Sequence, residues 1–160
     1  MTQPLLKEGL GFVVGVQLDP KRDLGYVAAI NNRHRLMIGY CFRRRDYPWV
    51  AVWEENRAIN SAPWRRRTQA RGLEFGTTAL PLPRSEAFAM GNLFGEPTYT
   101  HVPARGKKTI RYVGFLCRVP PDFENLKDLR AEKREILLFS TKGSQPVRLS
   151  ASGLPGLFED

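Results

Sequence analysis

The sequence predicts a mainly β protein, an antiparallel β-sandwich with one late α-helix. Two observations predict this class: apolar runs of strand length recur along the chain, and short turn sequences separate them. A chain of 160 residues fits one domain, which we place at residues 1–150. We expect the remaining residues, 151–160, to form a flexible tail.

The first third of the chain predicts a β-meander. Residues 11–18, 26–30 and 36–42 are apolar runs with the length and composition of strands. Turn sequences separate them, Asp-Pro-Lys-Arg-Asp at 19–23 and then an Asn-Asn pair. We therefore expect consecutive antiparallel strands here.

Two further strands follow in the middle of the chain. Residues 49–56 (WVAVWEEN) begin with apolar residues on both faces and end in two carboxylates and an amide, and residues 69–76 (QARGLEFG) alternate so that Glu74 lies opposite the apolar face. Residues 77–99 are rich in proline and glycine, which predicts a loop with a short helical turn near 86–90.

The last third predicts a long strand at 108–119, a break at the following Pro-Pro pair, and a helix at 122–135. Two short strands are expected after it, at 136–140 and 146–149. The helix prediction rests on an Asp start signal and on apolar residues at helical spacing, namely Phe123, Leu126 and Leu129.

Composition restricts the classes of protein that fit. Hydrophobic residues make up 42% and charged residues 26% of the chain, which is typical of a globular protein. No apolar run is long enough for a membrane span, and the N-terminus does not resemble a signal peptide, so we expect a cytoplasmic protein without membrane contact. Cys41 and Cys117 lie in apolar runs and are expected to be free buried thiols, with neighbouring positions on paired strands as the alternative. The two histidines, His34 and His101, have no ligand cluster beside them, so neither a metal site nor a cofactor is expected.

The chain is strongly basic, with a net charge of +9 and a pI of about 10.0. Much of this charge lies in two arginine triplets, at 43–45 and 65–67, and in Arg71. Such charge permits binding to nucleic acid or to another anion. Basic runs are more often solvated loops than readers of nucleic acid, so nucleic acid is not the partner that we expect first.

Acids beside aromatic residues are the most informative chemical pattern. Trp49, Trp53 and Trp64 lie near three polar residues at 54–56, and Glu74 lies between two glycines. An aromatic ring stacks on the apolar face of a sugar, and carboxylates and amides bind its hydroxyls. The alternative is structural, with the tryptophans in the core and the acids paired with nearby arginines.

Three segments in order, DYPWVAVWEENRA, ARGLEFGTTALPL and HVPARGKKTIRYVGFLCRV, resemble the C-terminal half of galactose mutarotase-like proteins, the aldose 1-epimerase superfamily. The resemblance spans about residues 24–119 and implies half of a β-supersandwich whose concave face holds a sugar. It implies that Glu74 is a general base on the anomeric hydroxyl. Neither histidine lies in a segment that matches the family's acid histidine, and the Pro-Gln pair common after the base is missing.

The residues and the resemblance together predict carbohydrate binding, with interconversion of sugar anomers as the activity that the resemblance implies. The expected substrate-binding residues are Trp53, Glu55, Asn56, Arg57, Trp64 and Arg71. A sugar phosphate is a second possible ligand, because guanidinium groups match phosphate geometry. The competing functions are a basic, non-enzymatic interaction module for nucleic acid or an acidic partner, and an inactive remnant of the family. Half of a sandwich leaves apolar strand faces uncovered, so we also expect a homodimer.

Overall fold

The structure is a computed structural model that describes residues 7–143 and 145–158. Its contacts divide the chain into two compact units. The first unit contains the described residues up to Leu18 together with Pro48–His101. The second contains Asp19–Tyr47 together with the described residues from Val102 onward. Both units consist mainly of antiparallel β-strands, which confirms the predicted fold class.

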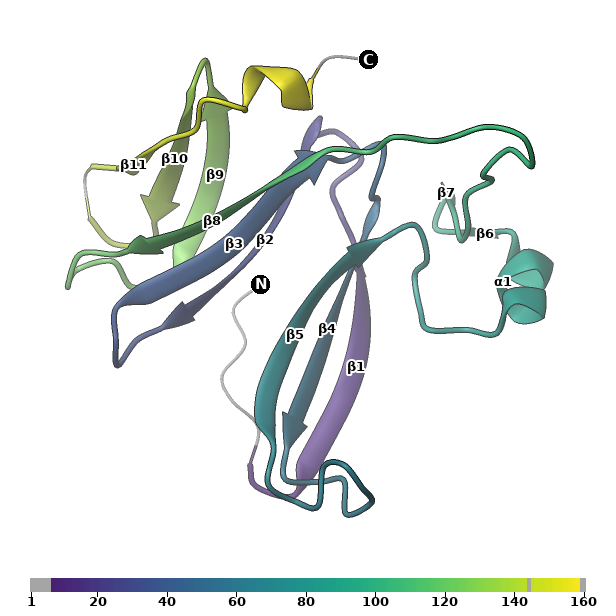
Figure 1. The fold of residues 1–160 in the computed structure, drawn as a ribbon. Helices are drawn as coiled ribbons and strands as arrows, with labels where there is room; N and C mark the ends of the chain where they lie inside the picture. Colours follow the sequence, from purple (N-terminus) through teal and green to yellow (C-terminus); the bar gives the residue numbers. More distant parts are fainter. Residues whose placement is uncertain (1–6, 144, 159–160) are drawn as a thin grey trace. The chain divides into compact units, whose positions relative to one another are not determined.

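The first unit is built on a three-stranded antiparallel sheet. Its strands are β1 (Leu10–Gln17), β4 (Trp49–Asn56) and β5 (Gln69–Gly76), and Figure 1 shows them side by side in the order β1-β4-β5. The strands predicted at 49–56 and 69–76 are confirmed. The predicted meander is wrong, because β1 pairs along its whole length with β4 and not with the next strand of the chain.

The remainder of the first unit is the segment from Thr77 to His101, which we call the excursion after β5. It contains the helix α1 (Arg84–Met90) and the two-residue strands β6 (Asn92–Leu93) and β7 (Glu96–Pro97). The short helical turn expected near residues 86–90 is therefore confirmed. Gly91 ends the helix with a φ of 63°, a left-handed conformation that glycine adopts without steric cost. None of the helices in the described part of the chain has the length and apolar character that crossing a membrane requires.

The second unit contains two three-stranded antiparallel sheets. One has the order β2-β3-β8 and the other the order β11-β10-β9. The strand bounds are β2 (Leu24–Asn31), β3 (Leu36–Arg43), β8 (Tyr112–Arg118), β9 (Leu126–Glu132), β10 (Glu135–Ser140) and β11 (Val147–Ser150). The turn between β2 and β3 uses the expected asparagine pair, because the Asn31 side chain accepts a hydrogen bond of 3.0 Å from the backbone N–H of His34.

A single hydrophobic core joins the two sheets of the second unit. Met37 and Cys41 from β3 are fully buried in one cluster with Leu129 from β9 and with Ile136 and Leu138 from β10. The two sheets therefore pack against each other as a β-sandwich does. Cys117 lies on β8, a strand that pairs with β3, but its partner in the register is Met37 and not Cys41, and both thiols are free.

The helix predicted at 122–135 is wrong, because this segment contains the strand β9 and a tight turn into β10. The register between β9 and β10 shifts by one residue at Phe139 and Ser140, so that Ser140 pairs with Leu126. This β-bulge allows Leu126 and Leu129, three positions apart, both to pack against the core. A strand with a bulge can thus place residues three positions apart on the core side, a spacing that is also typical of a helix.

The end of the described chain packs into the second unit. Leu154 and Leu157 are both 1% exposed and belong to its core, and Pro155–Leu157 forms the 3-10 helix η1. The sequence predicts a flexible tail over residues 151–160. Of these, 151–158 contribute two core side chains, and 159–160 lie outside the described residues.

Candidate functional site

One face of the first unit's sheet carries most of the predicted site. Side chains alternate along a strand, and the register aligns the three strands, so a common face can be assigned. We call it the tryptophan face. Its members are Trp49, Ala51, Trp53 and Glu55 on β4, Gly11, Val13, Gly15 and Gln17 on β1, and Ala70, Gly72, Glu74 and Gly76 on β5.

One end of the tryptophan face is covered by the excursion after β5. Trp49 is only 2% exposed, and its indole N–H donates a hydrogen bond of 3.0 Å to the carbonyl of Pro97. Gln17 donates through its side chain to the carbonyl of Phe94 at 3.1 Å. The backbone of Ala79 lies so close to Gly15 that a Cβ on this glycine would collide with it. This end of the face is therefore structural.

Beyond the covered residues the face carries Trp53 and Glu74, and Trp64 from the loop after β4 lies beside them; we call this part the open end of the face. The rings of Trp53 and Trp64 contact each other, with centroids 5.3 Å apart and an interplanar angle of 59°. Both rings are partly exposed, and Glu74 is exposed. A Cβ on Gly72 would lie 3.2 Å from Glu74 Oε1 and 3.4 Å from Trp53 Cε3. The carboxylate and the indole therefore lie over the same glycine, next to each other.

Glu55 supports the loop that carries Trp64. Its side chain is buried, and Oε1 accepts hydrogen bonds from the backbone N–H groups of Ala58 at 2.6 Å and Ile59 at 2.8 Å. The other oxygen, Oε2, lies over Gly11, where a Cβ would be 2.9 Å away. Glu55 is thus engaged by the backbone of the 57–68 loop, and it acts on Trp64 by holding this loop in place.

The remaining predicted residues lie away from the tryptophan face. Arg71 is on the opposite face of the sheet, where its Nε donates to Glu54 Oε2 at 2.9 Å. Asn56 lies on that same opposite face and accepts a hydrogen bond of 3.3 Å from Gln69. Arg57 has a φ of 59° and an ion pair with Glu8 at 3.1 Å. The structure therefore brings together Trp53, Glu55, Trp64 and Glu74, and it does not bring Asn56, Arg57 or Arg71 to them.

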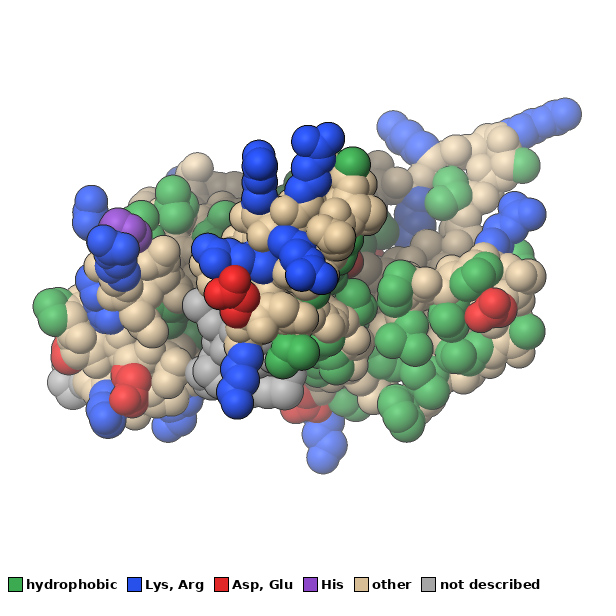
Figure 2. All heavy atoms as spheres, turned by 90° about the horizontal axis from the view of Figure 1, so that it is seen from below, with side chains coloured by type: hydrophobic (Ala, Val, Ile, Leu, Met, Phe, Trp, Pro, Cys, Tyr) green, Lys and Arg blue, Asp and Glu red, His purple; other side chains and the backbone are tan. Residues whose placement is uncertain are grey.

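The two arginine triplets have different surroundings. In the first, Arg43 pairs with Asp46 at 2.6 Å and Arg44 is buried, so this triplet is built into the second unit. In the second, residues 65–67 are all exposed in the loop between β4 and β5. Figure 2 views the molecule from below Figure 1, which is the side at which this loop lies, and Lys and Arg side chains project from the surface there.

The histidines and cysteines do not assemble a second chemical site. His34 lies in the exposed β2–β3 turn, and His101 packs edge-on against Tyr99 with centroids 5.2 Å apart. In the described residues, no group of three or more His, Cys, Asp or Glu side chains could hold a metal ion. Burial raises the pKa of the Cys41 thiol to about 12, which makes it a poor nucleophile.

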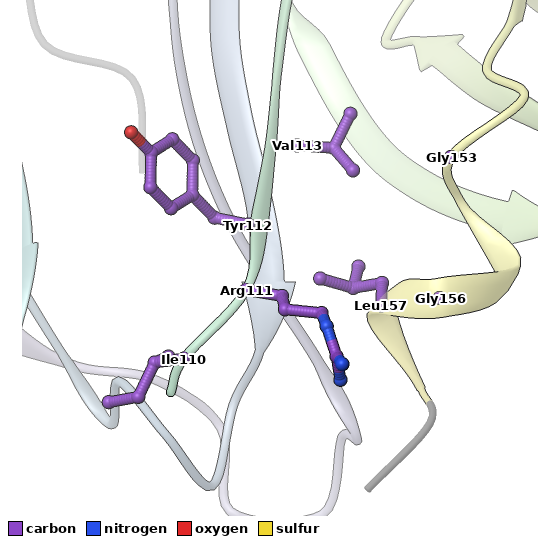
Figure 3. Close-up of a pocket in the computed structure, with 7 residues that line it drawn as sticks. All are labelled: Ile110, Arg111, Tyr112, Val113, Gly153, Gly156 and Leu157. Carbon is purple, nitrogen blue, oxygen red and sulfur yellow. The ribbon is translucent and has the colours of Figure 1, made fainter. Parts of the chain in front are cut away.

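The second unit has an open pocket of about 400 Å³ that the sequence did not predict. It lies between the segment that leads into β8 and the segment that contains η1. Figure 3 shows Arg111 and Val113 on the side of this strand that faces Leu157, with Tyr112 on the other side. Its lining residues are Ile110, Arg111, Tyr112, Val113, Gly153, Gly156 and Leu157. The signal in the sequence is the pair of glycines, Gly153 and Gly156, on either side of Leu154-Pro155, but they lie in the segment for which the sequence predicts a flexible tail.

Comparison with known proteins gives no relative: no family model, no curated protein and no solved structure matches the chain. The resemblance to galactose mutarotase-like proteins therefore stays a prediction. What can be argued about function depends on the residues and geometry described above.

Proposed function

We propose that this protein binds carbohydrate at the open end of the tryptophan face. The observation that carries the proposal is the contact between the Trp53 and Trp64 rings beside the exposed carboxylate of Glu74. An indole ring offers an apolar surface to the C–H face of a pyranose. A carboxylate beside it accepts hydrogen bonds from the sugar hydroxyls. Both contacts are needed to orient a sugar ring, and here they come from adjacent positions.

The surroundings of these side chains support this proposal. Gly72 has no side chain, which lets the Trp53 ring and the Glu74 carboxylate lie close together above it and offer both groups to one ligand. Trp64 stands on a loop that Glu55 fixes through two backbone hydrogen bonds. A ring that is held in place before binding loses less conformational entropy when a ligand arrives.

Interconversion of anomers is the reaction that the resemblance implies for this surface. In that reaction a base removes the proton of the anomeric hydroxyl while an acid, here a water molecule because neither histidine matches the family's acid, protonates the ring oxygen. The ring opens, and the reverse proton transfers close it on the other face. Glu74 is the group that we assign as the base, and a base of this kind contributes about 10²–10⁴-fold to a rate. Polarimetry on a freshly dissolved α-aldose measures the reaction. Glu74→Gln keeps an oxygen that accepts hydrogen bonds but loses the base, so we expect it to weaken sugar binding only modestly and to abolish the exchange. If the wild-type protein does not accelerate the exchange, the anomer activity is refuted and only the binding proposal stands.

Calorimetry with millimolar monosaccharides and oligosaccharides tests the binding itself. We expect heat with the wild-type protein, and a large loss of affinity for Trp53→Ala and Trp64→Ala. Tyr112→Ala is the matched control, because Tyr112 is an exposed aromatic residue of the second unit and lines its pocket. If only this control variant loses binding, the sugar binds in the pocket of the second unit and not on the tryptophan face. Absence of heat with every sugar would refute the proposal and favour the inactive remnant.

A basic interaction module is the second candidate, and the exposed arginines at 65–67 favour it. Aromatic rings next to arginines also bind single-stranded nucleic acid, by base stacking and by charge. Affinity for nucleic acid falls steeply with salt because condensed counterions are released. A gel-shift experiment with mixed DNA and RNA at several salt concentrations tests this candidate. Tight, salt-sensitive binding would place it ahead of carbohydrate.

A further inference from the structure

The loop between β4 and β5 carries a concentration of charge that the fold does not use. Residues 65–67 are three consecutive exposed arginines. Among the described residues, none of the three forms an ion pair, whereas Arg57 and Arg71 of the same unit pair with Glu8 and Glu54. These three guanidinium groups therefore keep their full capacity to bind an anion.

The backbone of this loop is ordered by hydrogen bonds. The N–H groups of Arg65, Arg66 and Arg67 donate to the carbonyls of Ser61, Ile59 and Trp64 at 3.0, 2.9 and 2.9 Å, respectively. These bonds, together with the two that Glu55 accepts, connect the backbone of the charged residues and of Trp64 within one hydrogen-bonded loop.

Two of the arginines occupy positions that do not favour them. Arg65 has a φ of 47° and Arg66 a φ of 54°. This left-handed region is unfavourable for a long side chain and suits glycine or asparagine. Local geometry alone would therefore select other residues here. Neither side chain forms an ion pair or hydrogen bond among the described residues, so a residue that breaks the local rule here points to a function of its side chain.

From this arrangement we propose that the ligand of the tryptophan face is an acidic oligosaccharide, whose anionic groups bind Arg65, Arg66 and Arg67. This inference rests on the proposed function. A guanidinium group matches a carboxylate, sulfate or phosphate with two parallel hydrogen bonds. Three guanidinium groups can pair with more anionic groups than a single uronate carries, which is why we infer an oligomer.

The charges near the face also predict the orientation in which the oligosaccharide binds. Glu74 is an acid beside Trp53, so an anionic group is repelled there, and a neutral sugar ring with its hydroxyls fits better. The arginines follow Trp64 directly in the chain, and Arg67 is tied to Trp64 by a backbone hydrogen bond. The anionic sugars of the ligand therefore lie on the Trp64 side, and a neutral ring lies over Trp53.

Binding of a matched pair of oligosaccharides tests the inference. The probes are a uronate oligosaccharide and the same oligosaccharide with its carboxylates reduced to alcohols, and quenching of tryptophan fluorescence measures both affinities. The test variant carries Arg65→Gln, Arg66→Gln and Arg67→Gln. The control variant carries Lys21→Gln, Arg105→Gln and Lys107→Gln, which removes the same charge from exposed positions of the second unit.

We expect the uronate oligosaccharide to bind about tenfold more tightly than its reduced form, because each exposed ion pair contributes roughly 1.5- to fivefold. The triple arginine variant should lose this difference and keep the affinity for the reduced form. The control variant should keep both affinities. Added salt should weaken binding of the uronate form alone, since charge is screened.

Five outcomes would overturn the inference. Equal affinities for the two forms would refute the acidic ligand and leave carbohydrate binding intact, whereas no binding of either form would refute both proposals. An equal loss in the control variant would mean that net charge and not these arginines is responsible. A hexose phosphate that binds as tightly as the oligosaccharide would refute an oligomeric ligand, and a single-stranded DNA that displaces it at lower concentration would favour nucleic acid.

Discussion

Replacing Glu55 by alanine should loosen the loop that carries Trp64. The change removes the acceptor of two backbone hydrogen bonds, of 2.6 and 2.8 Å, from Ala58 and Ile59. Hydrogen bonds to a charged group contribute about 1.5–3 kcal/mol each. Both N–H groups are only partly buried, so water can form hydrogen bonds with them in the variant and reduce the loss of stability. The variant also no longer buries the charge of Glu55, which reduces the loss further. We therefore expect a net destabilisation of about 2 kcal/mol.

Urea unfolding followed by tryptophan fluorescence measures this loss, because all three tryptophans lie in the first unit. Acrylamide should also quench Trp64 more readily in the variant. Gly11→Ala supplies a control, since its Cβ would lie 2.9 Å from Glu55 Oε2. It should cost about 1–2 kcal/mol alone and less in the Glu55→Ala background, where the carboxylate is gone. A Glu55→Ala variant with wild-type stability and quenching would refute the role assigned to this carboxylate.

Three further predictions concern the second unit and the whole chain. At pH 8 the Cys41 thiol should react with Ellman's reagent only after unfolding, because burial raises its pKa to about 12; rapid reaction of the folded Cys117→Ser variant, in which Cys41 is the remaining thiol, would contradict this. Burial opposes ionisation of Asp128, but hydrogen bonds from Arg22 and Arg130 hold its pKa below 3.8. Asp128→Asn should therefore cost about 0.5–1 kcal/mol at pH 7. In thermal melts, the stability difference between the wild-type protein and this variant should persist down to the pKa that Asp128 has in the unfolded chain. It should vanish as the pH falls through the lower pKa of Asp128 in the folded protein, and a difference that does not depend on pH would contradict the role assigned to Asp128. Light scattering at micromolar concentration should give a dimer, since apolar side chains such as Leu116 are exposed, and an 18.2 kDa monomer would refute self-association.

The strands of the candidate site could be predicted with their bounds. WVAVWEEN and QARGLEFG form β4 and β5 over the residues expected, because apolar alternation and adjacent turn residues define each strand locally. Alternation also places Trp53 and Glu55 on one face. That Glu74 shares this face depends on the pairing of Ala51 with Glu74, which the strand patterns do not specify.

Features that depend on distant pairing or on loop conformation were not predictable. β1 pairs with β4 across an intervening pair of strands, and local periodicity holds no information on such a partner. The false helix at 122–135 arose because a β-bulge gives Leu126 and Leu129 a helical spacing. The backbone contacts of Glu55 depend on the fold of a loop without periodicity. Its neighbour Gly11 could be understood only once that carboxylate was located.

The most direct test of the account is a titration of the ¹⁵N-labelled indole N–H signals with a uronate oligosaccharide. The chain has its own internal control, because Trp49 is buried and hydrogen-bonded to Pro97, whereas Trp53 and Trp64 lie at the open end of the face. We predict that the indole signals of Trp53 and Trp64 shift together with one dissociation constant, and that the signal of Trp49 stays in place. Unchanged Trp53 and Trp64 signals at millimolar ligand, or an equal shift of all three, would contradict carbohydrate binding at this face.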